Sequence, residues 1–263
     1  MNPPQPQGRK PVLAGMVLLL LAAVPFLPFL PQDQGYHHFA DGRALFGVAN
    51  TLDTLSNLPF VLAGLAGICM LMSGRLHLPG PAGTAAAWVF FAGLIATGLA
   101  SAWYHHAPSD AGLASDRYGM VIAFAGALGM AAAQKVGQRA AWLTTALALA
   151  CGPTAVLWWR HSGNVAPYVV MQFGGMLVLV VTLLWRSTAP GPNWGALVVA
   201  YALAKVFEAA DFQVFELTAH LVSGHTLKHL LAACAALAVI LPLRRGDKAS
   251  AMKQAKLRGL LKS

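Results

Sequence analysis

Long apolar stretches alternate with short breaks along this chain, and the breaks are rich in proline, glycine and charged residues. An α-helix needs roughly 20 mainly apolar residues to cross the hydrocarbon core of a bilayer. The stretches that reach this length are 12–31, 47–73, 83–106, 114–134, 140–159, 166–186, 194–213 and 223–243. The pattern therefore predicts an all-α fold, a polytopic membrane helical bundle that crosses the bilayer eight times.

The composition supports a membrane location. Of the 263 residues, 57% are hydrophobic and 10% are charged, whereas about 25% of the residues of an average soluble domain are charged. A surface in contact with lipid must be apolar, because nothing in the bilayer core can satisfy exposed polar groups. The breaks are also too short to form a separate extramembrane domain, which argues against a small soluble substrate.

The distribution of basic residues predicts the orientation of the chain. If the N-terminus is cytoplasmic, 13 of the 18 lysines and arginines lie on the cytoplasmic side, and only Arg43, Arg117 and Arg160 lie outside. Positively charged loops tend to stay on the cytoplasmic side of a membrane. We therefore expect both termini in the cytoplasm. We explain the net charge of +9 by the orientation of the chain in the membrane and by contact with lipid headgroups, rather than by nucleic-acid binding.

The first stretch and the tail each allow two interpretations. Arg9 and Lys10 precede the first stretch, as in a signal peptide, but its apolar core is long and it has no small-residue cleavage site. A retained helix is therefore favoured. The basic tail after Leu243 could lie on anionic headgroups or form a frayed, solvated end.

Acidic residues and histidines gather at one level of the predicted bundle. Eight of the nine acidic residues fall in its outer half, and only Asp247 falls inside. His225 and His229 are spaced i, i+4, so their side chains share one helix face. Ser101 and His105 have the same spacing, which favours His105 over its neighbour, His106, as a partner of that pair.

Asp116, at the start of the next stretch, adds a carboxylate at the same predicted depth. Three imidazoles that leave one coordination position open are typical of a catalytic zinc ion, which activates a bound water. A nearby carboxylate can exchange a proton with that water, and a serine hydroxyl can donate to a developing oxyanion. The simpler alternative is a set of hydrogen-bonded core histidines, which the HxxxH spacing alone does not exclude.

Two further polar stripes must face the interior of the predicted bundle. They comprise Asn50, Asp53 and Asn57 in one stretch, and Lys205, Glu208 and Asp211 in another. We expect both to form interhelical networks. Lys228 could pair with Glu208 or Asp211, or reach the headgroups. The remaining histidines, His37, His38, His77, His161 and His220, are expected in loops or at the interface.

Together these motifs resemble the alkaline ceramidase family, within the wider superfamily that includes the adiponectin and progestin receptors. The matching stretches are NTLDTLSNLPF at 50–60, GLASAWYHH at 98–106, SDRYGM at 115–120 and SGHTLKH at 223–229. The resemblance implies a seven-helix catalytic core at 47–243. It leaves an N-terminal tail, one extra helix and an outer loop at 1–46, and a basic cytoplasmic tail at 244–263.

The resemblance also implies a reaction. Members of the family hydrolyse the amide bond of an N-acylated lipid such as ceramide to a fatty acid and a free amine lipid. Zinc would be bound by His105, His225 and His229 near the outer face, Asp116 would deprotonate the water, and Ser101 would stabilise the oxyanion. The sequence departs from the family's calcium-binding cluster at Gly47, so it gives no support for a calcium site.

Other function classes fit less well. A lipid-sensing, receptor-like protein with a structural zinc site is the main alternative, and a lipid-accessible cavity that reaches the metal would favour the enzyme. Haem binding usually requires histidines on opposite sides of the iron, which two residues on one helix face cannot provide. A zinc protease of the HExxH type is disfavoured because HTLKH lacks the glutamate.

Overall fold

A computed structural model describes residues 8–187 and 189–244 of the chain. Every regular element in this part is helical, which confirms the predicted all-α class. In chain order the elements are α1 (Arg9–Ala23), η1 (Val24–Phe26), η2 (Gln34–His37), α2 (Thr51–Leu55), α3 (Leu58–Met72), α4 (Gly80–His106), α5 (Asp110–Lys135), α6 (Gln138–Ser162), α7 (Ala166–Val169), η3 (Val170–Gly174), α8 (Gly175–Leu183), α9 (Trp194–Ala209), α10 (Asp211–Leu217) and α11 (Gly224–Leu243). The basic tail predicted for 244–263 lies outside the described residues, apart from Arg244.

Each predicted apolar stretch contains a helix or a run of helices, but several of them are interrupted. The stretch 194–213 is divided between α9 and the start of α10. The stretch 47–73 is divided between α2 and α3, where Pro59 occupies the first turn of α3. The stretch 166–186 passes through a π-helical turn, η3, between α7 and α8. The first helical run, α1 followed by η1, ends at Phe26 rather than at residue 31, because the prolines at 28 and 31 cannot continue it.

Six helical segments among the described residues are long and apolar enough to cross a membrane. Of the eight predicted crossings, the two not among them are α9, which has 16 residues, and α5, which carries Asp116 and Arg117. Most of α5 is buried within the bundle, so its surface does not have to match lipid. The protein is therefore a helical membrane bundle, as predicted.

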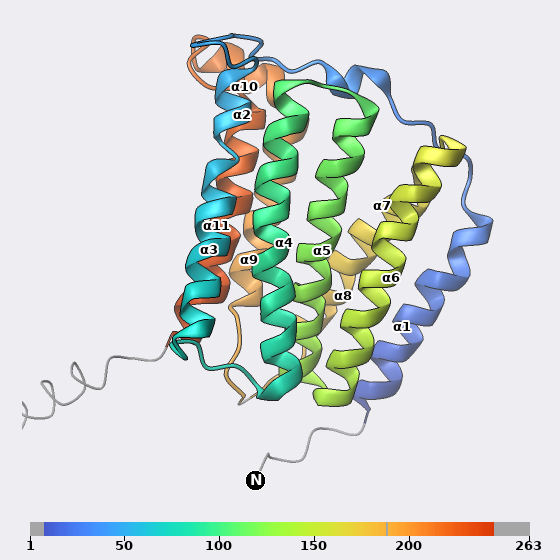
Figure 1. The fold of residues 1–263 in the computed structure, drawn as a ribbon. Helices are drawn as coiled ribbons and strands as arrows, with labels where there is room; N and C mark the ends of the chain where they lie inside the picture. The colour runs from blue at the N-terminus through green and yellow to red at the C-terminus, as the bar shows by residue number, and fades with distance from the viewer. Residues whose placement is uncertain (1–7, 188, 245–263) are drawn as a thin grey trace, which may run out of the picture.

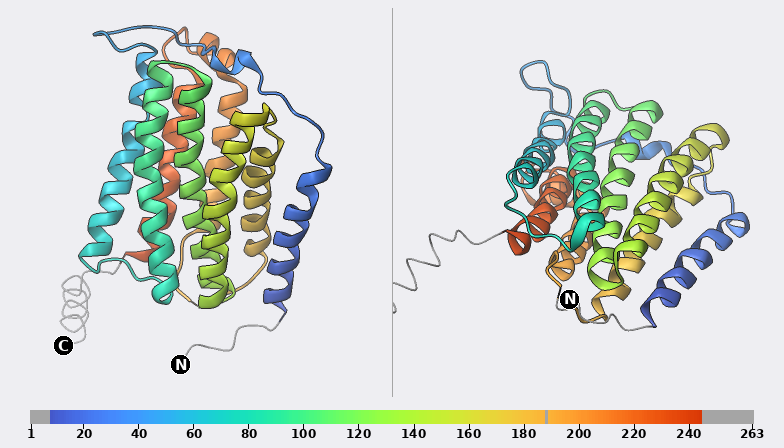
Figure 2. Two further views of the ribbon diagram at one scale, coloured as in Figure 1. Left: turned by 45° about the vertical axis from the view of Figure 1, so that its right-hand side comes forward. Right: turned by 60° about the horizontal axis from the view of Figure 1, so that its bottom comes forward.

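The long helices run side by side, and both ends of the described chain lie at the same end of the bundle (Figures 1 and 2). We call the end where α4 finishes and α11 begins the histidine end, and the other the opposite end. The segment 27–50 and α10 lie across the histidine end (Figure 1). Helix α1 lies at the edge of the bundle, and only 6% of its apolar window is buried.

Small residues bring α4 and α5 together. A Cβ atom at Gly93, Gly119 or Gly126 would overlap backbone atoms of the facing helix. Such close approach is common between membrane helices, because van der Waals packing replaces the hydrophobic effect as the driving force. The close pair α4–α5 places Ser101 and His105, near the end of α4, beside the first turns of α5.

Candidate metal centre

Three buried histidines converge at the histidine end. One potential ligand atom of each of His105, His225 and His229 lies within 4.8 Å of the others. His105 is near the end of α4, whereas the other two occupy the first two turns of α11, one turn apart. His106, the rival suggested by the sequence, is exposed. The structure thus places together the three histidines that the sequence analysis selected.

The hydrogen bonds of His229 leave one ring nitrogen free. The Ser56 hydroxyl donates to the Asp53 carbonyl oxygen and lies 2.8 Å from Nδ1 of His229. Because that hydroxyl proton is already used, we assign the ring proton to Nδ1, which donates to Ser56. Nε2 then carries a lone pair that points to no partner among the described residues. Such orientation of a ligand histidine by a neighbouring group is typical of metal sites.

The other two rings complete a set of donors that fits a metal ion. Both ring nitrogens of His105 are buried and unpartnered within the described part of the chain. Nε2 of His225 accepts from the Lys228 ammonium at 2.8 Å. Unpaired nitrogens in an apolar interior are costly, and a bound cation would satisfy them. The three-histidine group can hold a metal ion, and its geometry does not specify which metal.

The predicted polar stripe on α2 supports this cluster. The Asn50 amide donates to the His105 carbonyl oxygen at 2.7 Å, and Asp53 accepts from the hydroxyls of Ser223 and Thr226 at the start of α11. The backbone N–H of His225 donates to Asp211 at 2.7 Å. Asn50 and Asp53 of this stripe, together with Asp211 of the second predicted stripe, therefore fix the backbones that carry the histidines.

A second network lies beside His225. Glu208 accepts from Lys205, from Lys228 at 3.0 Å and from the Tyr36 hydroxyl at 2.8 Å. This is the interhelical network expected for Lys205 and Glu208, and it shows that Lys228 pairs with Glu208. Burial and the Glu208 carboxylate raise the pKa of Tyr36 well above its usual value, so this tyrosine is a hydrogen-bond donor.

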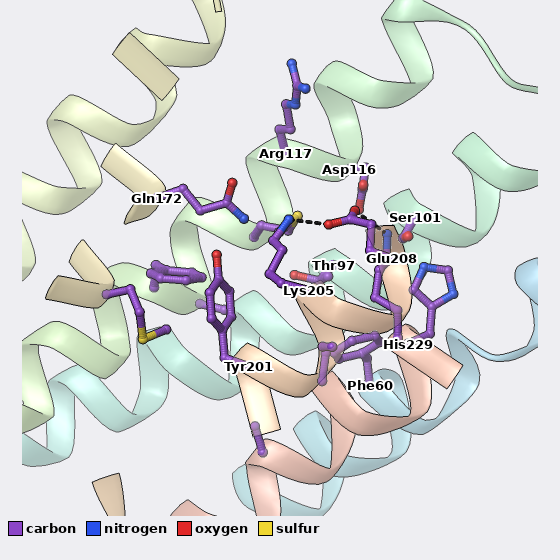
Figure 3. Close-up of a pocket in the computed structure, with 18 of the residues that line it drawn as sticks. Phe60, Thr97, Ser101, Asp116, Arg117, Gln172, Tyr201, Lys205, Glu208 and His229 are labelled. Atoms are coloured by element: carbon purple, nitrogen blue, oxygen red, sulfur yellow. Dashed lines mark hydrogen bonds and ion pairs between the residues drawn. The ribbon is translucent and has the colours of Figure 1, made fainter. Parts of the chain in front are cut away.

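Ser101 of α4 and Asp116 of α5 lie next to each other, near His229 (Figure 3). Both are buried, with 3% and 7% of their surfaces exposed. They line a cavity of about 290 Å³ that His229 also reaches. The predicted catalytic pair thus shares one cavity wall with a member of the three-histidine cluster.

Most of the cavity wall is apolar. Below Ser101 and Asp116, towards the opposite end, the lining residues include Phe90, Leu94, Ala127, Met176 and Leu179. Tyr201 and Gln172 interrupt this apolar wall (Figure 3). A cavity of this size and character is suited to the aliphatic chain of a lipid with a polar group at the histidine end.

The segment 27–50 closes the cluster at the histidine end. The Phe39 ring packs on His105 and His225, with ring centroids 4.5 and 5.0 Å apart. In the same segment, Asp41 forms an ion pair with Arg43 at 2.7 Å. Although burial opposes ionisation of Asp41, the Arg43 guanidinium lowers the pKa of that carboxyl below its usual value. Asp33 caps η2 instead of joining a carboxylate cluster.

Two residues of the site were missed by the sequence analysis. Ser56, which orients His229, sits between two positions of the polar stripe, and its only signal was that neighbourhood. Phe39 lies in a segment without periodicity, and nothing in its sequence context indicates contact with the histidines.

Comparisons with known proteins do not assign this chain to a family or to a function. The chain matches no protein-family model, and no curated protein is detectably similar to it. The function must therefore be argued from the site itself and from the motifs that form it.

Proposed function

We propose that this protein is a zinc-dependent amidase of the alkaline ceramidase type, which hydrolyses the amide bond of an N-acylated lipid in the membrane. The products would be a fatty acid and a free amine lipid. The observation that supports this most strongly is the three-histidine group beside a largely apolar cavity with Asp116 and Ser101 on its wall.

His105, His225 and His229 would hold the zinc ion. Three imidazoles without a fourth protein ligand are the usual donor set of catalytic zinc, whereas structural zinc sites are closed by four. When bound, the ion would supply Lewis acidity and an activated water near neutral pH. Within the described part of the chain, potential ligand atoms of these three histidines lie within 4.8 Å of one another.

The chain's own residues account for the proton transfers. The Asp116 carboxylate would take a proton from the attacking water and return it to the amide nitrogen as the C–N bond breaks. The water oxygen then remains on the acyl group as part of the fatty acid. The Ser101 hydroxyl can donate to the oxyanion that forms on the carbonyl oxygen. The apolar wall holds the acyl chain and excludes bulk water.

The main alternative is a receptor-like protein that senses lipid and uses zinc structurally. The cavity argues for the enzyme, because Asp116, Ser101 and His229 all line this one largely apolar space. A structural site would not require a carboxylate and a serine on the wall of such a space.

The decisive experiment measures fatty acid release from N-acyl sphingoid and N-acyl amino lipids by zinc-loaded protein in detergent. Asp116→Asn should retain zinc and lose about 10²–10⁴-fold in rate, because an amide cannot act as a base. Ser101→Ala should lose roughly 10²–10³-fold. Asp110→Asn and Ser115→Ala, which change less buried positions on the same helix, are the matched controls.

Two results would contradict the proposal. Full activity in zinc-loaded Asp116→Asn would reject the assigned base. Failure of zinc-loaded wild-type protein to cleave any N-acyl lipid would favour the receptor-like alternative.

We also propose that the histidine end faces the outside of the cell and that both termini are cytoplasmic. The excess of basic residues on one side supports this orientation. The two ends of the described chain also lie at the same end of the bundle (Figure 1). Reporters fused after Ser263 and inserted in the segment 32–46 should therefore lie on opposite sides, and the same side for both would reject the orientation.

A further inference from the structure

Arg117 is a buried guanidinium one residue after Asp116 on α5, and only 6% of it is exposed. Its Nη2 donates to the Gln32 side-chain oxygen at 2.6 Å. The guanidinium carbon lies 4.2 Å from the ring centre of Trp159 and 4.6 Å from that of Tyr168. The side chain is thus held firmly by a neutral amide and two aromatic faces.

These contacts leave the charge of Arg117 without a carboxylate partner. Within residues 8–187 and 189–244, no ion pair includes Arg117, and its Nη1 is buried without a hydrogen-bond partner. Lys205 and Lys228 share Glu208, and Arg160 pairs with Asp110. A buried charge is costly unless it is paired. Arg117 therefore has no anion in direct contact among the described residues, and the Asp116 carboxylate on the same cavity wall interacts with it only at longer range.

The position of Arg117 indicates where that anion would come from. Arg117 lines the same cavity as Ser101 and Asp116, together with Gln32 and Tyr36 from the segment at the histidine end. In Figure 3 its side chain extends away from Phe60 and Tyr201. The apolar wall continues from Ser101 and Asp116 in the other direction. An amide held at Ser101 and Asp116 would place its acyl chain on the apolar wall and its amine part beside Arg117.

We propose that Arg117 binds an anionic oxygen group, a carboxylate or a phosphate, on the amine part of the substrate. The preferred substrates would then be N-acyl lipids with a charged headgroup, such as N-acyl amino acids, rather than neutral ceramides. The planar guanidinium fork matches the oxygens of both groups. This inference rests on the proposed amidase function for the position of the amide.

Binding to metal-free, nanodisc-embedded protein tests this inference without turnover. The probes are N-palmitoylglycine, N-palmitoyl-O-phosphoethanolamine and the neutral N-palmitoylethanolamine. Wild-type protein should bind at least one anionic probe about 10–100-fold more tightly than the neutral one, as expected for a buried charge pair. The anionic probe that binds more tightly shows whether the site prefers a carboxylate or a phosphate. Arg117→Gln should abolish the preference, and Arg117→Lys should retain part of it.

Arg160→Gln is the matched control, because Arg160 also lies over the Trp159 ring but does not line the cavity. It should retain the preference. Equal binding of all three probes to wild-type protein would overturn the inference, even if the Arg117 variants failed to fold. Equally tight binding of palmitate would overturn the assignment of the anion to the amine part.

The same probes separate this inference from the amidase proposal. Cleavage of all three by zinc-loaded protein without an Arg117-dependent preference would reject the anion site and keep the amidase. An Arg117-dependent binding preference without cleavage of any probe would support the anion site and reject the amidase.

Discussion

The two ends of the bundle bury polar side chains in different ways. At the opposite end the buried Gln134 is satisfied, because its amide donates to the Ala189 carbonyl and accepts from the Trp194 indole at 2.6 Å. Around the histidine cluster and the cavity, eight buried polar atoms of the described residues have no partner. They are Asp53 Oδ2, Asn57 Oδ1, His105 Nδ1 and Nε2, Arg117 Nη1, Gln172 Nε2, Tyr201 Oη and His229 Nε2.

This difference distinguishes a region that is packed for stability from a region that is suited to binding. A buried donor or acceptor without a partner costs about 1–3 kcal/mol. Among the described residues, the buried polar atoms without a partner gather around the histidine cluster and the cavity, whereas Gln134 at the opposite end is satisfied. We therefore interpret the histidine end as the region that a cation and a ligand complete. The following changes test that contrast, from the largest expected effect to the smallest.

Removing one histidine of the cluster should have the largest effect. His229→Ala deletes one of three donors, so protein that binds about one zinc ion per chain should bind none at stoichiometric concentrations. Metal content by mass spectrometry is the measurement. His220→Ala, an exposed position outside the cluster, is the control. A full zinc content in His229→Ala would contradict the assigned donor set.

Disturbing the close packing should affect stability and spare the metal site. In Gly126→Ala the new Cβ would meet the Phe90 backbone and the Ala86 carbonyl oxygen. The free energy of unfolding in detergent should fall by about 1–3 kcal/mol. The control, Gly15→Ala, adds a Cβ with no atom within 4 Å and should not destabilise the protein. If Gly126→Ala lost zinc while its free energy of unfolding stayed unchanged, the roles assigned to the close-packed region and the histidine end would be contradicted.

Removing the hydroxyl that orients His229 should weaken metal binding without abolishing it. Ser56→Ala leaves Nδ1 of His229 without its 2.8 Å partner, so zinc affinity should fall by about 10–100-fold. Competition with a chelator measures the change. Ser73→Ala, where the hydroxyl bonds only to carbonyls of its own helix, should leave the affinity unchanged.

Removing the lysine beside His225 should have the smallest effect, in the opposite direction. In Lys228→Met the Nε2 lone pair of His225 becomes free, and a repelling positive charge disappears. Zinc affinity should rise by roughly 3–10-fold. Lys205→Met is the matched control, because Lys205 also pairs with Glu208. A weaker affinity in Lys228→Met than in Lys205→Met would show that Lys228 supports the cation site.

Helix register accounts for the part of the site that the sequence predicted. His225 and His229 share a face of α11 because their spacing is close to one helical turn, and the same geometry separates His105 from His106 on α4. The contacts of Ser56 and Phe39 could not be predicted, because they depend on how α2 and the segment 27–50 pack against distant helices. The interruption at η3 had no signal in the hydropathy pattern.

The sequence alone determined the class of the fold and the residues available for chemistry, because apolar length and helical periodicity are local properties of the chain. Only the tertiary structure decided which of those residues meet. The packing of α3 against both α4 and α11 brings His105 to a pair more than a hundred residues away, and the cavity beside Asp116 exists only between assembled helices. Such contacts arise from packing between residues that are far apart in the sequence, and the local sequence pattern contains no information about them.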